Sequence, residues 1–217
     1  MAYKIWQHPT TASCPTVYTH SFSDDGSALW TSCQQLGCPT FHLVCIYDLP
    51  MDAALTPWPS DPVRKGQAPF PGEAKKHLQM LCEDIVPEVE HQLSTPSSYN
   101  ALAGYSLAGL FTLWSATQTG IFHRLACASA SFWYPNFLSF LQQHHFVENP
   151  ECVYLSLGDK ESKTRHPLMQ QIETDTAAVL QILKERGINT YFEMNPGNHF
   201  TEPSLRMAKA IRWMLAQ

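Results

Sequence analysis

The chain has 217 residues, of which 44% are hydrophobic and only 15% are charged, and its formal net charge is −5. This composition excludes long disordered segments, which need low hydrophobicity and high charge, and it offers no basic surface for nucleic acid. No apolar run approaches the ~20 residues of a membrane span, and the N-terminus lacks the apolar stretch of a signal peptide. The expected location is the cytoplasm, with neither nucleic acid nor a membrane as a partner.

The cysteine and histidine patterns indicate neither a disulfide framework nor a metal site. The seven cysteines are odd in number and scattered, and no C-x-x-C occurs, so a disulfide framework is not expected. No His-x-His or His-Glu-x-x-His pattern occurs, and the adjacent pair His144–His145 falls in a polar stretch typical of a solvated helix end. The sequence therefore predicts no metal site.

Strand-like and helix-like segments alternate along the chain. In order they are predicted as strand 17–21, helix 26–36, strand 41–49, helix 73–93, strand 99–104, helix 106–117, strand 125–129, helix 137–143, strand 153–157, helix 168–186, strand 189–194 and helix 203–215. This alternation is typical of βαβ units on a mostly parallel sheet. The prediction is one three-layered α/β domain over residues 1–217, with its site beyond the carboxyl ends of the strands.

A proline-rich stretch interrupts the alternation at residues 50–71. Its six prolines exclude a long helix or a central strand, because each removes a backbone donor. A loop of that length in a compact domain is usually functional or disordered, and Trp58 and Phe70 favour a segment that docks onto the body. In the helix that follows, Pro87 is expected to introduce a kink.

The residues after strand 99–104 fit a nucleophile elbow. Gly104-Tyr105-Ser106-Leu107-Ala108 is a Gly-x-Ser-x-Ala variant, preceded by a strand and followed by an apolar helix. The tight turn strains the serine backbone and lifts Oγ clear of the sheet, and the helix N-terminus places N–H groups beside it. The alternative is a glycine-rich turn with a helix-capping serine. The context favours Ser106 as a nucleophile.

A serine hydroxyl needs a base to take its proton, and in this fold the partners follow in the order Ser, acid, His, each after its own strand. His199 follows strand 189–194 in a Gly-Asn-His setting and is the expected general base. Asp159 and Glu161 both follow strand 153–157. We favour Glu161, because glutamate reaches further and because an acid three residues after a glycine turn is the usual spacing in the hydrolases that this elbow resembles. Asp159 would then be a turn former.

Acyl transfer also needs N–H donors for the developing oxyanion. The fold places one donor at the N–H of Leu107, directly after the nucleophile. We expect the second donor in the loop after strand 41–49. Pro50 has no N–H, so the second donor is Leu49 or Met51, and we take Leu49 as the expected one.

These motifs resemble the putative-esterase family of α/β-hydrolases, which holds enterochelin esterases, esterase D-like enzymes and mycolyltransferases. The resemblance spans roughly residues 40–215. The segments that carry it are Gly104–Phe111, Ser129–Pro135, Leu157–Glu161 and Gly197–Phe200, with Pro57-Trp58-Pro59 and Phe70–Ala74 resembling a substrate-side loop. It implies an α/β-hydrolase fold and a serine esterase.

The sequence departs from that family at two places. Ala108 stands where many hydrolases have glycine, and the usual His-Gly of the oxyanion loop is replaced by Tyr47-Asp48-Leu49-Pro50. The segment 131–150 is too short for a large lid domain, so an open site is expected. Its aromatic walls are expected to include Trp133, Tyr105, Trp58 and Tyr134, although aromatic residues of this kind also serve as core packing.

The predicted function is a serine hydrolase that cleaves an ester or thioester of a small molecule through an acyl-enzyme on Ser106, with no metal or organic cofactor. One alternative is an acyltransferase with the same Ser-His-acid triad, because the sequence does not separate water from another acceptor. The other is a binding protein that keeps the fold but has lost catalysis. The oligomeric state cannot be read from the sequence.

Overall fold

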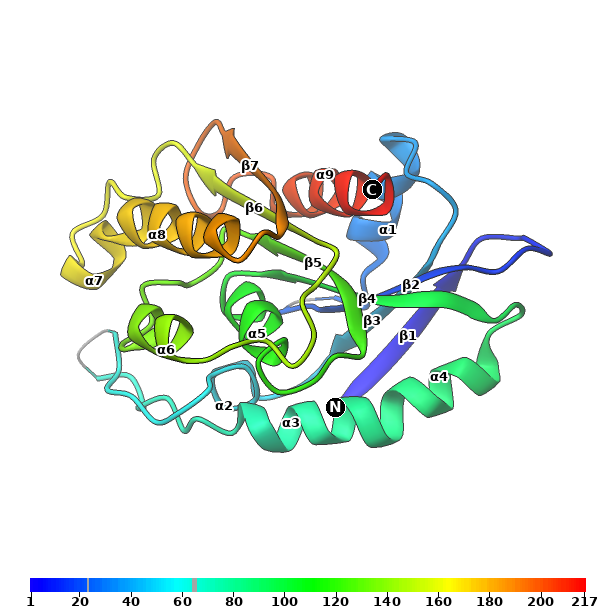
Figure 1. Cartoon of the computed structure of the whole chain (residues 1–217), viewed down its shortest axis with the longest axis horizontal. Helices are drawn as coiled ribbons and strands as arrows, with labels where there is room; N and C mark the ends of the chain where they lie inside the picture. The colour runs from blue at the N-terminus through cyan, green and yellow to red at the C-terminus, as the bar shows by residue number, and fades with distance from the viewer. Residues whose placement is uncertain (23, 64–65) are drawn as a thin grey trace.

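The computed structural model describes residues 1–22, 24–63 and 66–217. Within these residues one sheet has the strand order β1-β3-β2-β4-β5-β6-β7 (Figure 1). The strands are β1 (Ala2–Gln7), β2 (Cys14–His20), β3 (His42–Tyr47), β4 (Ser97–Tyr105), β5 (Phe122–Ala128), β6 (Cys152–Gly158) and β7 (Asn189–Asn195). Strand β1 is antiparallel to β3, and every other neighbouring pair is parallel. Strand β2 therefore lies between β3 and β4.

Helices cover both faces of the sheet and give the chain the three-layered α/β-hydrolase fold. They are α1 (Ser27–Gln35), α2 (Met51–Ala54), α3 (Ala74–Met80), the π-helical turn η1 (Leu81–Ile85), α4 (Val86–Gln92), α5 (Leu107–Ser115), α6 (Phe137–Gln143), α7 (Pro167–Gln170), α8 (Ile172–Glu185) and α9 (Pro203–Leu215). Helices α1 and α9 pack on one face, and helices α2 to α6 and α8 pack on the other (Figure 1). No large lid covers the sheet in the described part of the chain.

Strands β4 and β5 are buried on both faces over residues 101–104 and 125–128, and their side chains alternate in size. Leu102 of β4 and Leu125 of β5 face α5, whereas Ala101, Ala103 and Ala126 face α1 and α9. Because successive strand residues point to opposite faces, this alternation puts large side chains on one face and small ones on the other. The alanine face leaves room for α9 to lie directly on the sheet.

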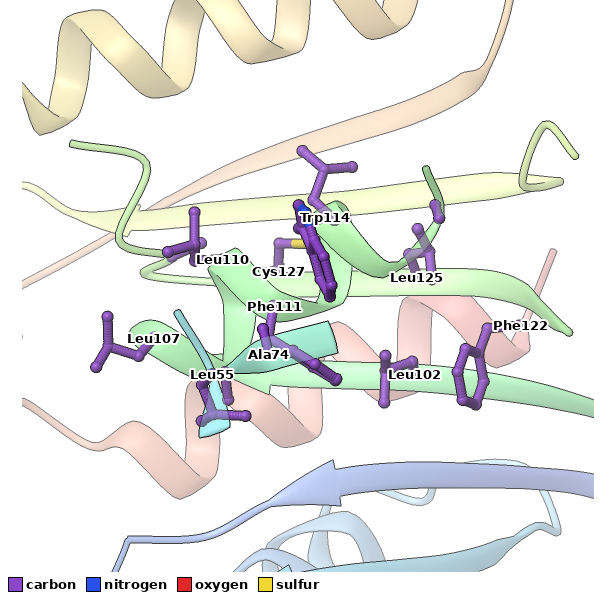
Figure 2. Packing of buried hydrophobic residues seen from close by; sticks show 14 of the residues in the cluster. Leu55, Ala74, Leu102, Leu107, Leu110, Phe111, Trp114, Phe122, Leu125 and Cys127 are labelled. Atoms are coloured by element: carbon purple, nitrogen blue, oxygen red, sulfur yellow. The ribbon is translucent and has the colours of Figure 1, made fainter. Parts of the chain in front are cut away.

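Helix α5 fills the centre of the larger core. Leu107, Leu110, Phe111 and Trp114 are all buried, and Figure 2 shows them among side chains of β4, β5 and the segments around Leu55 and Ala74. Burying a side chain of this size stabilises the fold by roughly 1.5–3 kcal/mol. The apolar helix that follows Ser106 is thus anchored over its whole length, which fixes the position of its N-terminus.

The predicted kink at Pro87 takes the form of a π-helical turn. Residues 74–92 are helical throughout, but the hydrogen bonding widens over Leu81–Ile85, and Pro87 stands in the first turn of α4. A proline lacks the N–H of a regular α-helix and its ring clashes with the preceding turn, and a wider turn relieves both problems.

Other elements differ from the sequence prediction in extent. Strand β1 was not predicted, helix 168–186 is divided into α7 and α8 at Gln171, and the proline-rich stretch begins with the short helix α2. The predicted docking of that stretch is confirmed for Trp58 and Phe70, which pack against the core. Among the described residues, no helix combines the length and the apolar character needed to cross a bilayer.

Candidate active site

Ser106 lies at the sharp turn from β4 to α5, with φ 58° and ψ −123°. This backbone region is sparsely populated for residues with a side chain. Two glycines allow the turn: a Cβ on Gly104 would collide with the backbone of Ala108, and a Cβ on Gly109 would lie 2.6 Å from the Cβ of Ala130. The geometry is that of a nucleophile elbow, in which strand and helix approach closely enough to present the hydroxyl.

Gly104→Ala is expected to destabilise the protein by at least about 2 kcal/mol, because its Cβ meets fixed backbone atoms and the elbow must open. Urea unfolding measures the effect. The matched control is Gly37→Ala, where a Cβ meets nothing within 4 Å and only the positive φ of 62° opposes the change, at about 1–2 kcal/mol. Equal losses in the two variants would contradict this account of the elbow.

Three side chains that are far apart in sequence come together at this turn. Ser106 Oγ lies 3.0 Å from His199 Nε2, and His199 Nδ1 lies 2.7 Å from Glu161 Oε2. Ser106 follows β4, Glu161 follows β6 and His199 follows β7, so each comes from the carboxyl end of its strand. With Glu161 ionised, Nδ1–H donates to the carboxylate, which leaves Nε2 free to accept the serine proton.

The structure brings Glu161, and not Asp159, to His199. The Asp159 carboxylate is exposed and its Oδ1 accepts a hydrogen bond from the N–H of Gly197 at 2.7 Å. This contact ties the loop after β6 to the loop after β7, as expected for a turn-forming aspartate.

Glu161 is a buried carboxylate with a full set of partners. Its Oε1 accepts from Ser129 Oγ at 2.7 Å, from the N–H of Gly158 at 2.6 Å and from Arg206 Nη1 at 3.0 Å. Burial disfavours the charged form, but hydrogen bonds led by those from His199 and Ser129 outweigh it, so the pKa of Glu161 lies below its ordinary value. The carboxylate therefore stays ionised at neutral pH.

Arg206 was not singled out from the sequence, although it contacts the site from behind. Arg206 is only 2% exposed. Besides Glu161, Nη1 donates to Tyr105 Oη at 3.3 Å, while Nη2 donates to the carbonyls of Pro196 and Asn198, both at 3.0 Å. The sequence did contain a pattern that indicates a buried arginine. Arg206 shares a face of α9 with buried residues four and eight positions later, and a cation on such a face needs a buried partner.

The N–H of Leu107 begins α5 and donates to no acceptor in the described part of the chain. It is therefore available beside the serine, and its role as an oxyanion donor stays a prediction. The expected second donor is wrong, because Leu49 follows β3, which is separated from β4 by β2. Leu49 packs against the core and lines neither cavity at Ser106, and the same holds for the alternative Met51, which is buried in α2.

The segment that does reach this position is the carboxyl end of β2, the direct neighbour of β4, together with the residues that follow it. His20, Ser21 and Phe22 all line the larger cavity at Ser106. The N–H of Ser21 is bonded to the carbonyl of Ile46 at 2.9 Å, whereas the N–H of Phe22 has no acceptor among the described residues. Within the described part of this segment, the N–H of Phe22 is therefore the backbone donor that has no acceptor.

Two cavities meet at Ser106, His199 and Phe200. The larger has a volume of about 450 Å³ and includes Tyr105 and Phe22, and the smaller has a volume of about 230 Å³ and includes Trp133. Two of the three predicted substrate contacts, Tyr105 and Trp133, therefore line the site. Both phenylalanines at the rim are exposed, Phe200 by 82% and Phe22 by 56%.

The expectation for Trp58 is wrong, since Trp58 lines neither cavity. Its Nε1–H donates to the carbonyl of Pro135 at 2.9 Å, and its ring centroid lies 5.1 Å from that of Phe140. Tyr134 is buried beside it and donates its hydroxyl to the carbonyl of Trp58 at 2.6 Å. Both aromatic residues hold the proline-rich stretch against the core.

A buried histidine pair lies next to the larger cavity. His20 Nε2 and His77 Nε2 are 2.8 Å apart, and the ring of Phe111 packs against both. Burial lowers the pKa of His77 to about 4, and burial together with the neighbouring His77 lowers the pKa of His20 well below its ordinary value. Both rings are therefore neutral in the folded protein at neutral pH.

Stability is expected to fall by roughly 2–4 kcal/mol between pH 7 and pH 5, because these two rings bind protons in the unfolded chain below about pH 6.5 but not in the folded one. Stability is then full above that pH and is lost as the pH falls towards the folded pKa values. Urea unfolding across this range measures the slope. His77→Gln should reduce it, and the exposed His91→Gln should not; a flat profile for the unaltered protein would contradict the assignment.

The comparisons with known proteins agree with this architecture. A family model named Esterase, described as Putative esterase, matches residues 43–203, which is more than half of the chain. The chain belongs to this family. The esterase is thus a carboxylic ester hydrolase, and the resemblance predicted from its motifs is confirmed.

Solved structures support the fold of the esterase. It is similar to an IroE-like serine hydrolase from Shewanella oneidensis, with a TM-score of 0.84, 17% identity and coverage of 99% of this chain and 75% of the other. It is also similar to the siderophore hydrolase EstA from Aspergillus nidulans, with a TM-score of 0.76, 19% identity and coverage of 99% and 90%. A sequence relative, the uncharacterized protein YbbA of Bacillus subtilis, is 24% identical over 185 residues, which are 80% of this chain and 72% of the relative.

Proposed function

We propose that this esterase cleaves a small-molecule carboxylic ester, or a thioester, through an acyl-enzyme on Ser106. The observation that carries the proposal is the continuous contact from Ser106 Oγ to His199 Nε2 at 3.0 Å and from His199 Nδ1 to Glu161 Oε2 at 2.7 Å. A nucleophile, a base and an acid that orients the base are the requirements for activating a serine hydroxyl.

In the first half of the reaction, Ser106 Oγ attacks the ester carbonyl while its proton moves to His199 Nε2. The C–O bond to the alcohol then breaks, and the proton on His199 leaves with the alcohol. In the second half, water attacks the acyl-enzyme, His199 takes the water proton and returns it to Ser106 Oγ, and the acid is released. Glu161 stabilises the imidazolium formed in each half and keeps its own charge, in line with its lowered pKa.

The oxyanion formed in each half is held by backbone donors. We assign this role to the N–H of Leu107, at the positive end of α5, and to the N–H of Phe22, on the neighbouring strand end. A site with such donors already oriented stabilises the developing charge without reorganisation. Arg206 acts behind the reacting groups, where it holds the Glu161 carboxylate and the carbonyls of the His199 loop.

A graded series of p-nitrophenyl esters, from acetate to octanoate, tests the proposal. We expect turnover with at least one ester and, after rapid quenching, a mass increase equal to the acyl group on the peptide that contains Ser106. An acyl group on another residue, or turnover with no acyl adduct under any quench, would refute the acyl-enzyme. Added alcohols and amines reveal whether the acyl group also passes to an acceptor other than water.

We also propose that the esterase acts in a reducing compartment such as the cytoplasm. All seven cysteines are free, and most are buried. Scattered, unpaired and buried cysteines are typical of proteins that fold where thiols stay reduced.

A further inference from the structure

The two cavities that meet at Ser106 differ in charge. Among the residues that line the larger one, Asp24 is the acidic side chain, and its Oδ1 already accepts from the Ser21 hydroxyl at 3.2 Å and from the N–H of Gly26 at 2.7 Å. The smaller cavity is lined by two cations, Lys160 and Lys163, and by one acid, Glu161. The difference places positive charge on one side of the nucleophile.

Among the described residues, no acidic side chain is paired with the two lysines of the smaller cavity. The Glu161 carboxylate is bound to Arg206 and His199, so it is already paired with other groups. The ammonium groups of Lys160 and Lys163 form no ion pair and no hydrogen bond with the residues that the structure describes. Both lysines are exposed at the mouth of the cavity and can turn towards a bound anion.

The size and walls of the smaller cavity define the group that fits. Its volume of about 230 Å³ suits a small group, and Trp133 provides an aromatic surface beside the two ammonium groups. On the basis of the proposed function, we infer that the preferred substrate is a monoanionic ester. The portion of the ester in the smaller cavity carries a carboxylate that Lys160 and Lys163 bind, and the larger cavity takes the uncharged portion.

Two matched substrate pairs test the inference on either side of the ester bond. The first pair, p-nitrophenyl hydrogen glutarate and p-nitrophenyl valerate, differs by a carboxylate on the acyl portion. The second, 4-acetoxybenzoate and its methyl ester, differs by a carboxylate on the alcohol portion. In one pair we expect kcat/KM to be about tenfold higher for the anionic member, as two solvent-exposed ion pairs to one carboxylate allow. About 0.5 M salt should weaken this preference.

Lys160→Gln/Lys163→Gln should abolish the preference, whereas Lys75→Gln/Lys76→Gln, which removes the same charge from the exposed face of α3, should keep it. Equal or better use of the neutral member in both pairs, or a preference that survives in Lys160→Gln/Lys163→Gln, would overturn the inference. The proposed function fails separately, if Ser106→Ala hydrolyses the neutral esters as fast as the unaltered protein does.

Discussion

Ser106→Ala is expected to lower kcat by about 10⁴-fold or more, because in the proposed mechanism Ser106 forms the acyl-enzyme and its loss leaves only oxyanion binding. Its stability should change little. Alanine has similar backbone preferences to serine at φ 58°, and among the described residues the Ser106 hydroxyl forms hydrogen bonds with the His199 imidazole and, at 3.3 Å, with the Ser131 hydroxyl. Steady-state kinetics with the best p-nitrophenyl ester and urea unfolding measure the two quantities.

A fluorophosphonate probe supplies an independent readout for this variant. The unaltered protein and the control Ser139→Ala, an exposed serine on α6, should both be labelled, and Ser106→Ala should not. Rapid labelling of Ser106→Ala, or hydrolysis at an unchanged rate, would rule out Ser106 as the nucleophile.

Arg206→Gln is expected to destabilise the protein by about 3–5 kcal/mol, because it leaves the buried Glu161 carboxylate without its cationic partner. Turnover should also fall, since Arg206 holds both the acid and the loop that carries His199. Arg206→Lys keeps the charge but not the five-donor geometry, so it should recover stability better than turnover. Urea unfolding and kcat, measured on the same preparations, separate the two effects.

A double variant distinguishes charge pairing from simple packing. Glu161→Gln/Arg206→Met removes both charges, so it should be more stable than Arg206→Gln although it lacks activity. Arg212→Gln changes an exposed arginine of the same helix and should leave stability within about 0.5 kcal/mol. If the double variant is no more stable than Arg206→Gln, the buried charge is not the source of the loss.

The local features of the site could be predicted from the sequence because each has a local cause. The elbow around Ser106 needs glycines at fixed positions, and His199 follows a strand in a turn-forming segment, so both stand out in a one-dimensional pattern. The choice of Glu161 over Asp159 rested on its spacing from the glycine turn and on side-chain reach, and in the structure Glu161 contacts His199. The segments that became β2 to β7 were each located, because apolar runs bounded by turn residues are strong signals.

The features that were missed depend on which strands become neighbours. Leu49 was taken as an oxyanion donor because the fold was expected to supply the second donor from the loop after strand 41–49, but β2 lies between that strand and β4, and nothing local in either strand specifies this order. Strand β1 is a half-buried edge strand whose pattern is weak. Trp58 was assigned to the site as an aromatic residue, and Arg206 was not considered. Their roles depend on partners distant in sequence, which are Pro135 for Trp58 and Glu161 for Arg206.

The exposed rim of the site, formed by Phe22 and Phe200, bears on the fate of the acyl group. Because both rings are exposed to solvent, an acyl-enzyme formed by the proposed mechanism stays within reach of bulk water. Water then has no need of a binding site of its own, whereas a competing alcohol or amine must occupy one of the cavities to intercept the acyl group. The fraction of the acyl group that passes to an acceptor instead of water is therefore set by the affinity of that acceptor for the cavities. A dilute acceptor without such affinity leaves hydrolysis as the outcome.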